Sequence, residues 1–285
     1  MSRRALTLAA CLAWALGPAA PAGAVYPDAW QWTLEAAPSV FSPRMHGMDN
    51  ALVYEGINVL DLAWRSLPAA ANTGISHGYS KIEWGYGGQI GIAHEFNEDL
   101  RGGLFLGLTG VWKSEQRQGL TDSSSWTISG SAFTSSTTYR MDVSIALPLV
   151  TIGVYLHKVF RYEEEPNLRT YIGGWGAYGS LVGGDITAKF TRAGSNSPVS
   201  FSADLTAQGY NAGGLAGIEY AVARTVAIYG ETGFQWCIIP KVQWLNSQLG
   251  SGRLGNSTSK PLNLDYSGFF IRAGVKVALG GSSSG

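Results

Sequence analysis

The segment from Asp265 to Leu279 alternates between apolar and polar residues along its length. One set of alternate positions holds Phe269, Ile271, Ala273, Val275, Val277 and Leu279, and the other holds Phe270, Arg272, Gly274 and Lys276. Because the side chains of a strand point to opposite faces in turn, this pattern predicts a strand with one apolar and one charged face. The apolar face of such a strand belongs either in the core of a soluble sheet or against the lipid around an outer-membrane barrel.

Further segments alternate in the same way, which gives eight predicted strands in all. The other seven lie at about residues 30–41, 81–95, 100–114, 137–160, 168–182, 207–222 and 225–238. Each is long enough for the roughly 9–11 residues that a tilted strand needs to cross a bilayer. The short connections all fall at one end, and the long ones, at about 42–80, 115–136, 183–206 and 239–264, fall at the other. An even number of strands with turns at one end and loops at the other is typical of outer-membrane barrels.

The fourth predicted strand changes the parity of its apolar residues near Pro148. These residues stand at odd positions from Tyr139 to Leu147 and at even positions from Val150 to Leu156. A β-bulge inserts one extra residue and so reverses which positions face a given side. The sequence therefore predicts a bulge beside Pro148.

The composition of the chain favours the membrane interpretation. Charged residues make up 14% of the 285 residues, against about 25% in an average soluble domain. No internal run approaches the roughly 18 apolar residues that a membrane-spanning helix needs. Low charge without such a helix is unusual for a soluble protein and is expected for a barrel.

The N-terminus predicts an export signal. Arg3 and Arg4 precede an apolar stretch, and Ala22-Gly23-Ala24 provides a cleavage site of small residues, so residues 1–24 are expected to be removed. Residues 25–279 would then form the barrel and 280–285 a flexible Gly/Ser tail. Cleavage leaves 18 basic residues against 20 acidic ones, a balance that does not suggest a nucleic-acid partner. It also leaves one cysteine, Cys237, so no internal disulfide is expected.

Aromatic residues gather near the ends of the predicted strands. Indole and phenol rings favour the membrane interface, where one edge of the ring is apolar and the other is hydrated. We therefore expect two aromatic girdles, formed by Trp30, Trp32, Tyr155 and Tyr220 at the turn end and by Trp84, Tyr86, Trp112, Tyr139, Tyr210 and Trp236 at the loop end.

Two segments carry a resemblance to a known group of proteins. They are Ala146-Leu-Pro-Leu-Val-Thr-Ile-Gly-Val-Tyr155 and Arg169-Thr-Tyr-Ile-Gly-Gly-Trp-Gly176. With the signal peptide and the eight amphipathic strands, they resemble the small outer-membrane barrels, which include OmpA-type membrane domains, OmpX, OmpW and the opacity-like adhesins. The resemblance covers nearly all of the mature chain and implies an eight-stranded antiparallel up-and-down barrel with short periplasmic turns and four long extracellular loops. The chain departs from the group at Leu279, where those barrels usually end on an aromatic residue that their assembly machinery recognises.

The inward faces of the predicted strands carry charges of both signs. They are Glu35, Glu83, Arg101, Lys113, Arg140, Asp142, Glu219, Glu231, Arg272 and Lys276. Eight strands leave an interior barely wide enough for side chains, so these charges must pair with one another. Two interpretations follow, a salt-bridged plug that stabilises the barrel and a narrow pore or gate through the same residues.

The histidines provide the remaining candidate chemistry. His46, Asp49 and His77 share the first long connection, where they are candidates for a metal or catalytic cluster. His94 and His157 are expected at the membrane interface near the turn end. In the same connection, apolar residues between Val53 and Leu67 recur at helical spacing before Pro68, which predicts a short amphipathic helix.

The sequence as a whole favours a non-enzymatic barrel in a bacterial outer membrane, with a structural or adhesin-like role and no cofactor. Its expected partners are outer-membrane lipid and lipopolysaccharide, the barrel-assembly machinery during biogenesis, and an extracellular or envelope protein bound by the loops. The alternatives are a narrow channel for small or hydrophobic solutes, an enzyme that acts on outer-membrane lipid, and a secreted soluble β-sandwich.

Overall fold

The computed structural model describes residues 31–44, 82–128, 131–194, 196, 198–247, 252–253 and 263–279. The predicted signal peptide, Trp30, the first long connection with His46, Asp49 and His77, its predicted helix and the C-terminal tail lie outside the described residues. Among the residues described, no helix is long and apolar enough to cross a membrane.

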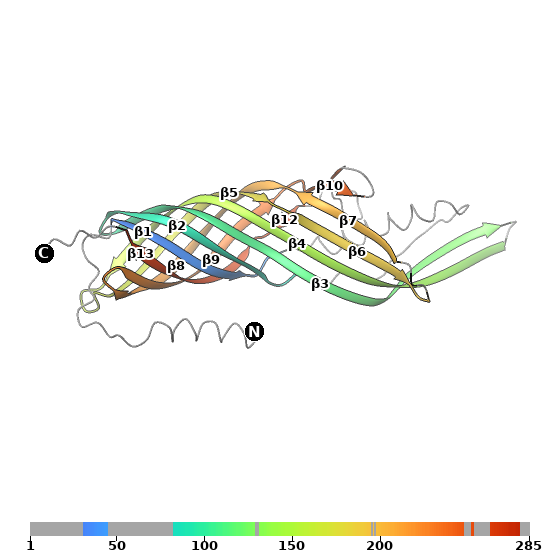
Figure 1. Cartoon of the computed structure of the whole chain (residues 1–285), viewed down its shortest axis with the longest axis horizontal. Coiled ribbons are helices and arrows are strands. Elements are labelled where there is room, and N and C mark those ends of the chain that lie inside the picture. Colours follow the sequence, from blue (N-terminus) through green and yellow to red (C-terminus); the bar gives the residue numbers. More distant parts are fainter. Residues whose placement is uncertain are drawn as a thin grey trace.

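Eight antiparallel strands close into a barrel (Figure 1). They are β1 (Trp32–Phe41), β2 (Gly85–Asn97), β3 (Leu100–Ile128), β4 (Ser131–Arg161), β5 (Leu168–Leu181), β8 (Gln208–Ala223), β9 (Val226–Ile239) and β13 (Gly268–Ala278). Each strand pairs with the next in this order, and β13 returns to pair with β1, as in Glu35 opposite Lys276. The predicted eight-stranded up-and-down barrel is confirmed, and closure leaves the barrel without a free edge.

The short connections lie at one end of the barrel, as the sequence indicates. In the turn between β2 and β3, the Asp99 amide donates a hydrogen bond to Asn97 Oδ1 at 2.9 Å. The Lys158 ammonium donates a hydrogen bond to the Asp99 carboxylate and lowers the pKa of that carboxyl below its usual value. Asn and Asp favour such turns because their side chains bond their own backbone.

Two of the connections predicted to be loops are largely strands, and a third contains short strands among its described residues. β3 and β4 continue together from Gly110 opposite Pro148 to Ile128 opposite Ser131. The stretch 183–206 forms β6 (Gly184–Arg192) and β7 (Pro198–Thr206), and β6 pairs with the upper part of β4. The stretch 239–264 contributes β10 (Gln243–Ser247), β11 (Gly252–Arg253) and part of β12 (Leu264–Asp265). We call this set of strands beyond the barrel the extension; it lies to the right in Figure 1.

The predicted bulge at Pro148 is wrong. β3 and β4 pair without a shift from Leu100 opposite Lys158 to Arg117 opposite Met141, and odd residues of β4 face inward on both sides of Pro148. What changes is the surroundings of the strand. Val143, Ile145 and Leu147 are buried inside the extension, whereas Ile152, Val154 and Leu156 are exposed on the outside of the barrel. The strand therefore passes from an apolar exterior to an apolar core without any change of register.

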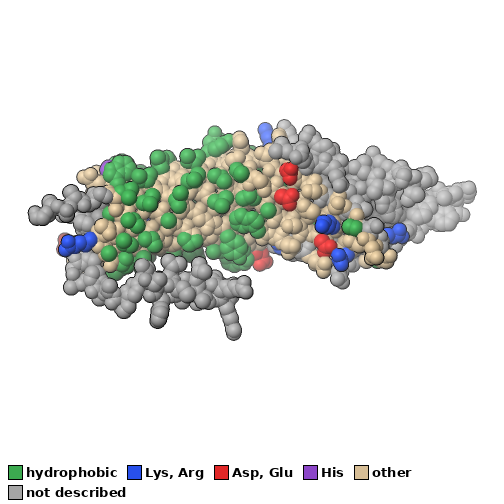
Figure 2. All heavy atoms as spheres, viewed as in Figure 1, with side chains coloured by type: hydrophobic (Ala, Val, Ile, Leu, Met, Phe, Trp, Pro, Cys, Tyr) green, Lys and Arg blue, Asp and Glu red, His purple; other side chains and the backbone are tan. Residues whose placement is uncertain are grey.

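The barrel and the extension have opposite polarity. Around the barrel, apolar side chains form a broad outer band, visible in green in Figure 2, and charged side chains appear beyond it toward the loop end. In the extension the arrangement is that of a soluble protein, with an interior that we call the upper core. Its buried members include Val111, Val143, Ile145, Leu147, Ile186, Leu205, Ile239, Val242, Leu264 and Tyr266.

Candidate functional site in the barrel lumen

The outer face of the barrel is apolar and is bordered by aromatic rings. Its exposed side chains include Leu34, Ile90, Leu104, Leu106, Ile152, Val154, Ile172, Ile218, Ile228 and Ile271. An outward apolar band around a polar interior is the polarity of a transmembrane barrel, and it argues against a secreted β-sandwich, whose apolar residues would be inside.

Seven of the predicted girdle residues lie exposed at the two borders of this band. Trp32 and Tyr220 lie toward the turn end, and Trp84, Tyr86, Trp112, Tyr210 and Trp236 lie toward the loop end. Exposed Phe96, Phe160 and Tyr162 extend the turn-end ring, and exposed Tyr178 and Phe269 extend the loop-end ring. Trp30 and the Tyr139 side chain fall outside the described part of the chain.

Tyr155 does not belong to the girdle. It is buried in the lumen, where its hydroxyl donates a hydrogen bond to Glu35 Oε2 at 2.9 Å. His157, expected at the interface, is also buried in the lumen, between the rings of Tyr155 and Tyr171 at centroid distances of 4.5 and 4.9 Å. Both residues are odd-numbered positions of β4, opposite in parity to the outward residues Ile152, Val154 and Leu156. They were assigned to the interface from their place near the turn end of the strand, against the parity that the sequence shows there. By contrast, His94 lies on the outer side, where Nδ1 lies 2.7 Å from the Gln31 carbonyl oxygen and the ring packs against Trp32.

A cluster of six charged residues fills the turn end of the lumen. We call Glu35, Glu95, Arg101, Arg169, Glu219 and Lys276 the ion cluster. Glu219 accepts from Arg101 Nη1 at 2.8 Å and from Lys276 Nζ at 2.5 Å, and Lys276 also lies 3.3 Å from Glu35. Arg169 joins the cluster through Glu95 at 2.7 Å and Glu219 at 3.9 Å. Three carboxylates therefore balance three cations in a volume almost wholly removed from water.

Tyrosine rings complete the pairing of these charges. Lys276 Nζ lies 4.7 Å from the ring centroids of both Tyr171 and Tyr229, and the Arg101 guanidinium lies 4.8 Å from that of Tyr171. Cations this close to an aromatic face are attracted by the negative charge of its π-system. The Tyr171 hydroxyl also donates to Glu231 Oε1 at 2.7 Å, and Glu231 pairs with Arg272 one layer toward the loop end.

The structure places six of the ten predicted lumen charges inside the barrel. They are Glu35, Arg101, Glu219, Glu231, Arg272 and Lys276. The other four lie toward or within the extension: Glu83 is exposed, Lys113 is half-buried, and Arg140 and Asp142 form a pair at 3.1 Å near the surface. Arg140 and Asp142 are on the even-numbered, outward face of β4, because the bulge that assigned this face inward is absent. Lys113 shares the inward parity of Val111 but lies above the lumen.

Sequence reasoning missed Glu95 and Arg169. Glu95 continues the odd-numbered face of β2 that includes Gln89, which lines the lumen. Arg169 lies on a glycine-rich strand whose faces could not be told apart, although it pairs directly opposite Glu219. Glu95 is the last residue of the strand predicted at 81–95, so applying the odd-numbered inward parity to the whole strand would have found it. Arg169 could be found only from the register of the strands.

Interior glycines make room for the large lumen side chains. A Cβ on Gly217 would lie 2.4 Å from Cζ of Tyr171, and one on Gly173 would lie 2.4 Å from Cδ2 of His157. These distances are far below van der Waals contact. Gly173 of β5 and Gly217 of β8 are therefore required for the packing of the aromatic side chains inside.

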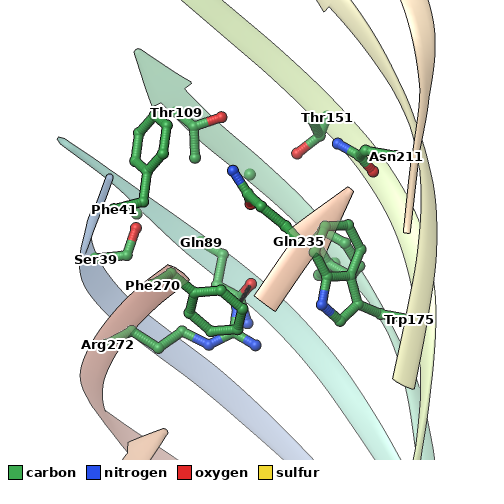
Figure 3. Close-up of a pocket in the computed structure, with 13 residues that line it drawn as sticks. Ser39, Phe41, Gln89, Thr109, Thr151, Trp175, Asn211, Gln235, Phe270 and Arg272 are labelled. Atoms are coloured by element: carbon green, nitrogen blue, oxygen red, sulfur yellow. Dashed lines mark hydrogen bonds between the residues drawn. The ribbon is translucent and has the colours of Figure 1, made fainter. Parts of the chain in front are cut away.

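A polar cavity lies next to the ion cluster, toward the loop end. We call it the chamber; its volume is about 50 Å³. All eight barrel strands contribute to its wall, and Figure 3 shows the labelled side chains converging on it. The lining residues are Ser39, Phe41, Gly88, Gln89, Phe105, Gly107, Thr109, Thr151, Trp175, Asn211, Gln235, Phe270 and Arg272.

Above the chamber the upper core begins. Tyr266 is fully buried there, its ring stacked on Phe41 at a centroid distance of 6.3 Å. Its hydroxyl donates to the Leu147 carbonyl oxygen at 2.9 Å. From the turn end to the loop end, the axis of the barrel thus passes through the ion cluster, a polar chamber and apolar residues.

The described residues contain no group of three or more His, Cys, Asp and Glu side chains placed to hold a metal ion. The candidate cluster of His46, Asp49 and His77 lies outside them. The lumen as described is suited to structural ion pairing and to hydrogen bonding of a small guest.

Comparison with known proteins adds three similar solved structures. No family model matches the chain, and no curated protein matches it. Neisserial surface protein A is 14% identical, with a TM-score of 0.38, over 87% of this chain and 97% of that one. The outer membrane protein OprG from Pseudomonas aeruginosa is 6% identical, with a TM-score of 0.38, over 86% and 94%. Ail, the attachment invasion locus protein of Yersinia pestis, is 13% identical, with a TM-score of 0.32, over 86% and 98%. The barrel architecture itself rests on the closed ring of strand pairings.

Proposed function

We propose that this protein is a non-enzymatic barrel of a bacterial outer membrane, which anchors a surface-exposed extension for envelope integrity or for adhesion. The observation that carries the proposal is the reversal of polarity along the chain. An apolar outer band with aromatic borders suits hydrocarbon, and the upper core with a polar exterior suits water. Export by the signal peptide at residues 1–24 is part of the proposal.

The ion cluster favours an anchor over a channel. Its six charges have mutual partners, and Arg101, Arg169, Glu219 and Lys276 are 1–3% exposed. Charges buried to this degree are stabilised only by their partners, so the cluster resists separation. A conducting path would have to break it.

The extension provides the surface for interaction. From Gly110 to Ile128, β3 continues for 18 residues beyond its last pairing with β2, or roughly 60 Å at about 3.3 Å per residue. Paired strands of this length hold a surface far from the lipid headgroups. The proposed partners are therefore lipid and lipopolysaccharide around the band, the assembly machinery during insertion, and an extracellular or envelope protein at the extension.

Complementation of a deletion strain separates the two roles. One strain receives the full chain, and the other receives a variant in which residues 121–138, the outer part of the β3–β4 hairpin, are replaced by an Asn-Gly turn. If both the full chain and the shortened variant restore resistance to detergent, the barrel has an envelope role. If only the full chain restores attachment to epithelial cells, the extension is an adhesin. If neither variant restores either property, the proposal fails.

Planar-bilayer recordings test the channel alternative. We expect the purified full chain to give no conductance steps above the bilayer background. Regular single-channel steps would replace the anchor with a pore as the function of the barrel.

A further inference from the structure

The chamber is lined by groups that are ready to bind a guest. The Asn211 side chain is 7% exposed and lines the chamber, yet its Oδ1 has no hydrogen-bond partner among the described residues. Trp175 lines the same space, and its Nε1 likewise has no acceptor there. Buried donors and acceptors are normally paired, so an unpaired acceptor and an unpaired donor in one cavity leave two hydrogen bonds for a guest to make.

The remaining chemistry of the wall selects an uncharged guest. Ser39, Thr109 and Thr151 contribute hydroxyls. The one charged side chain of the wall, Arg272, is already held by Glu231 and by Gln89 Oε1. A charged guest would therefore find no free counter-ion in the wall. The volume of about 50 Å³ accommodates about four non-hydrogen atoms, at roughly 10–15 Å³ for each water-sized guest.

Tyr266 lies next to the loop side of this chamber, in contact with the lining residues Phe41 and Gln235. It belongs to the segment that enters β13, whereas Leu147 belongs to β4, which lies on the opposite side of the ring of strands. Leu147 is four residues beyond the chamber residue Thr151 along β4. The Tyr266 side chain thus crosses the barrel above the chamber and stacks on Phe41, which lines the chamber wall.

The attachment of Tyr266 is local and asymmetric. Tyr266 and Ser267 lie between β12 and β13 and belong to neither strand. On the near side, the Tyr266 amide donates to the Cys237 carbonyl oxygen at 2.8 Å, and its own carbonyl oxygen accepts from Gln235 Nε2 at 2.7 Å. On the far side, its side-chain hydroxyl donates a hydrogen bond to the Leu147 carbonyl oxygen. Rotation of this side chain breaks that bond and leaves the backbone bonds in place.

We propose that the chamber is a binding site for a small uncharged hydrogen-bonding solute, and that Tyr266 acts as a lid that restricts access from the loop side. The turn side is closed by the ion cluster. Movement of Tyr266 should therefore admit solute from the loop side without producing a pore, because the ion cluster stays in place. This inference requires the barrel but does not depend on whether the extension is adhesive.

Cysteine accessibility tests the lid. In a Cys237→Ala background, Thr151→Cys places a thiol in the chamber, and methyl methanethiosulfonate, a small uncharged reagent, is added to the purified protein in detergent. We expect Tyr266→Ala to raise the labelling rate at least tenfold and Tyr266→Phe, which keeps the ring, to raise it less. Tyr178→Ala, which removes an outward tyrosine, should leave the rate unchanged. An unchanged rate in Tyr266→Ala overturns the proposal.

A second thiol position is the control for a general loosening of the barrel. Thr33→Cys lies at the turn end, on the far side of the ion cluster from the chamber, and its labelling rate should not respond to Tyr266→Ala. A parallel increase at both positions overturns the lid, because the whole barrel would then have opened. Heat-dependent gel mobility verifies that each variant is folded.

Competition and conductance complete the test. In the Tyr266→Ala variant, acetamide should slow the labelling of Thr151→Cys at least twofold, whereas tetramethylammonium should not. Equal slowing by both, or by neither, overturns the proposed ligand class. The same variant should remain silent in planar bilayers, and regular conductance steps would overturn the closure of the turn side by the ion cluster.

Discussion

Glu219 is the carboxylate on which the cations of the lumen converge. It contacts Arg101, Arg169 and Lys276 and is 1% exposed. Removing one charge from such a buried group leaves its partners without compensation, which costs more than the intact cluster contributes. We therefore expect Glu219→Gln to lower the free energy of unfolding by about 3–5 kcal/mol, measured by urea unfolding in lipid vesicles.

The matched control for Glu219 is Asp142→Asn. Asp142 pairs with Arg140 near the surface, where their side chains are 31% and 50% exposed, and exposed pairs contribute about 0–1 kcal/mol. A loss at Asp142 as large as that at Glu219 would show that the ion cluster has no special role in stability.

Glycine positions offer a second residue-scale prediction. Gly217→Val should destabilise the barrel by about 1–3 kcal/mol, because overpacking displaces the Tyr171 ring. A Cβ at Gly230 meets no atom within 4 Å, so Gly230→Ala should change stability by less than about 0.5 kcal/mol. The midpoint of the heat-dependent gel shift measures both variants. Equal sensitivity at the two positions would contradict the packing argument.

At the scale of elements, β4 shows how one strand serves two environments. Ile152 and Ser144 are both even-numbered and both exposed, yet Ile152 lies in the apolar band and Ser144 lies in the extension. A nitroxide label at Ile152 should be relaxed more by oxygen, which concentrates in lipid, and one at Ser144 more by a water-soluble nickel chelate. An immobile, buried label at Ser144 would instead indicate that Ser144 faces inward and that a bulge is present at Pro148.

The same strand shows what the sequence can and cannot reveal. Alternation identified all eight barrel strands, because each has an apolar face that must meet lipid. It could not show where the lipid ends, since an apolar residue reads alike in a lipid-facing row and in a core. Val143 and Ile152 were therefore assigned to one outer face, and the bulge was introduced to reconcile them. The Ser- and Thr-rich hairpins were taken for loops because neither of their faces is continuously apolar.

Lumen charges were predictable to the extent that strand parity was known. Lys276 and Arg272 followed from the regular alternation of β13, and Glu231 followed from that of β9. Arg169 could not be assigned, because the glycines of β5 leave both faces equally small. The chamber and the position of Tyr266 could not be predicted from the sequence, because they depend on which side chains of separate strands lie at the same height along the barrel axis.

For the whole molecule, both the ion cluster and Tyr266 lie on the barrel side of the outer hairpin. The ion cluster lies at the turn end of the lumen and Tyr266 lies at the base of the extension, whereas Thr121 pairs with Thr138 further out on β3 and β4. The variant in which an Asn-Gly turn replaces residues 121–138 should therefore keep the heat-dependent gel shift of the full chain and remain silent in planar bilayers. Conductance steps in this variant would show that the hairpin closes the lumen. A lost gel shift would show that the barrel cannot fold without the hairpin, and that the barrel and the extension form a single cooperative unit.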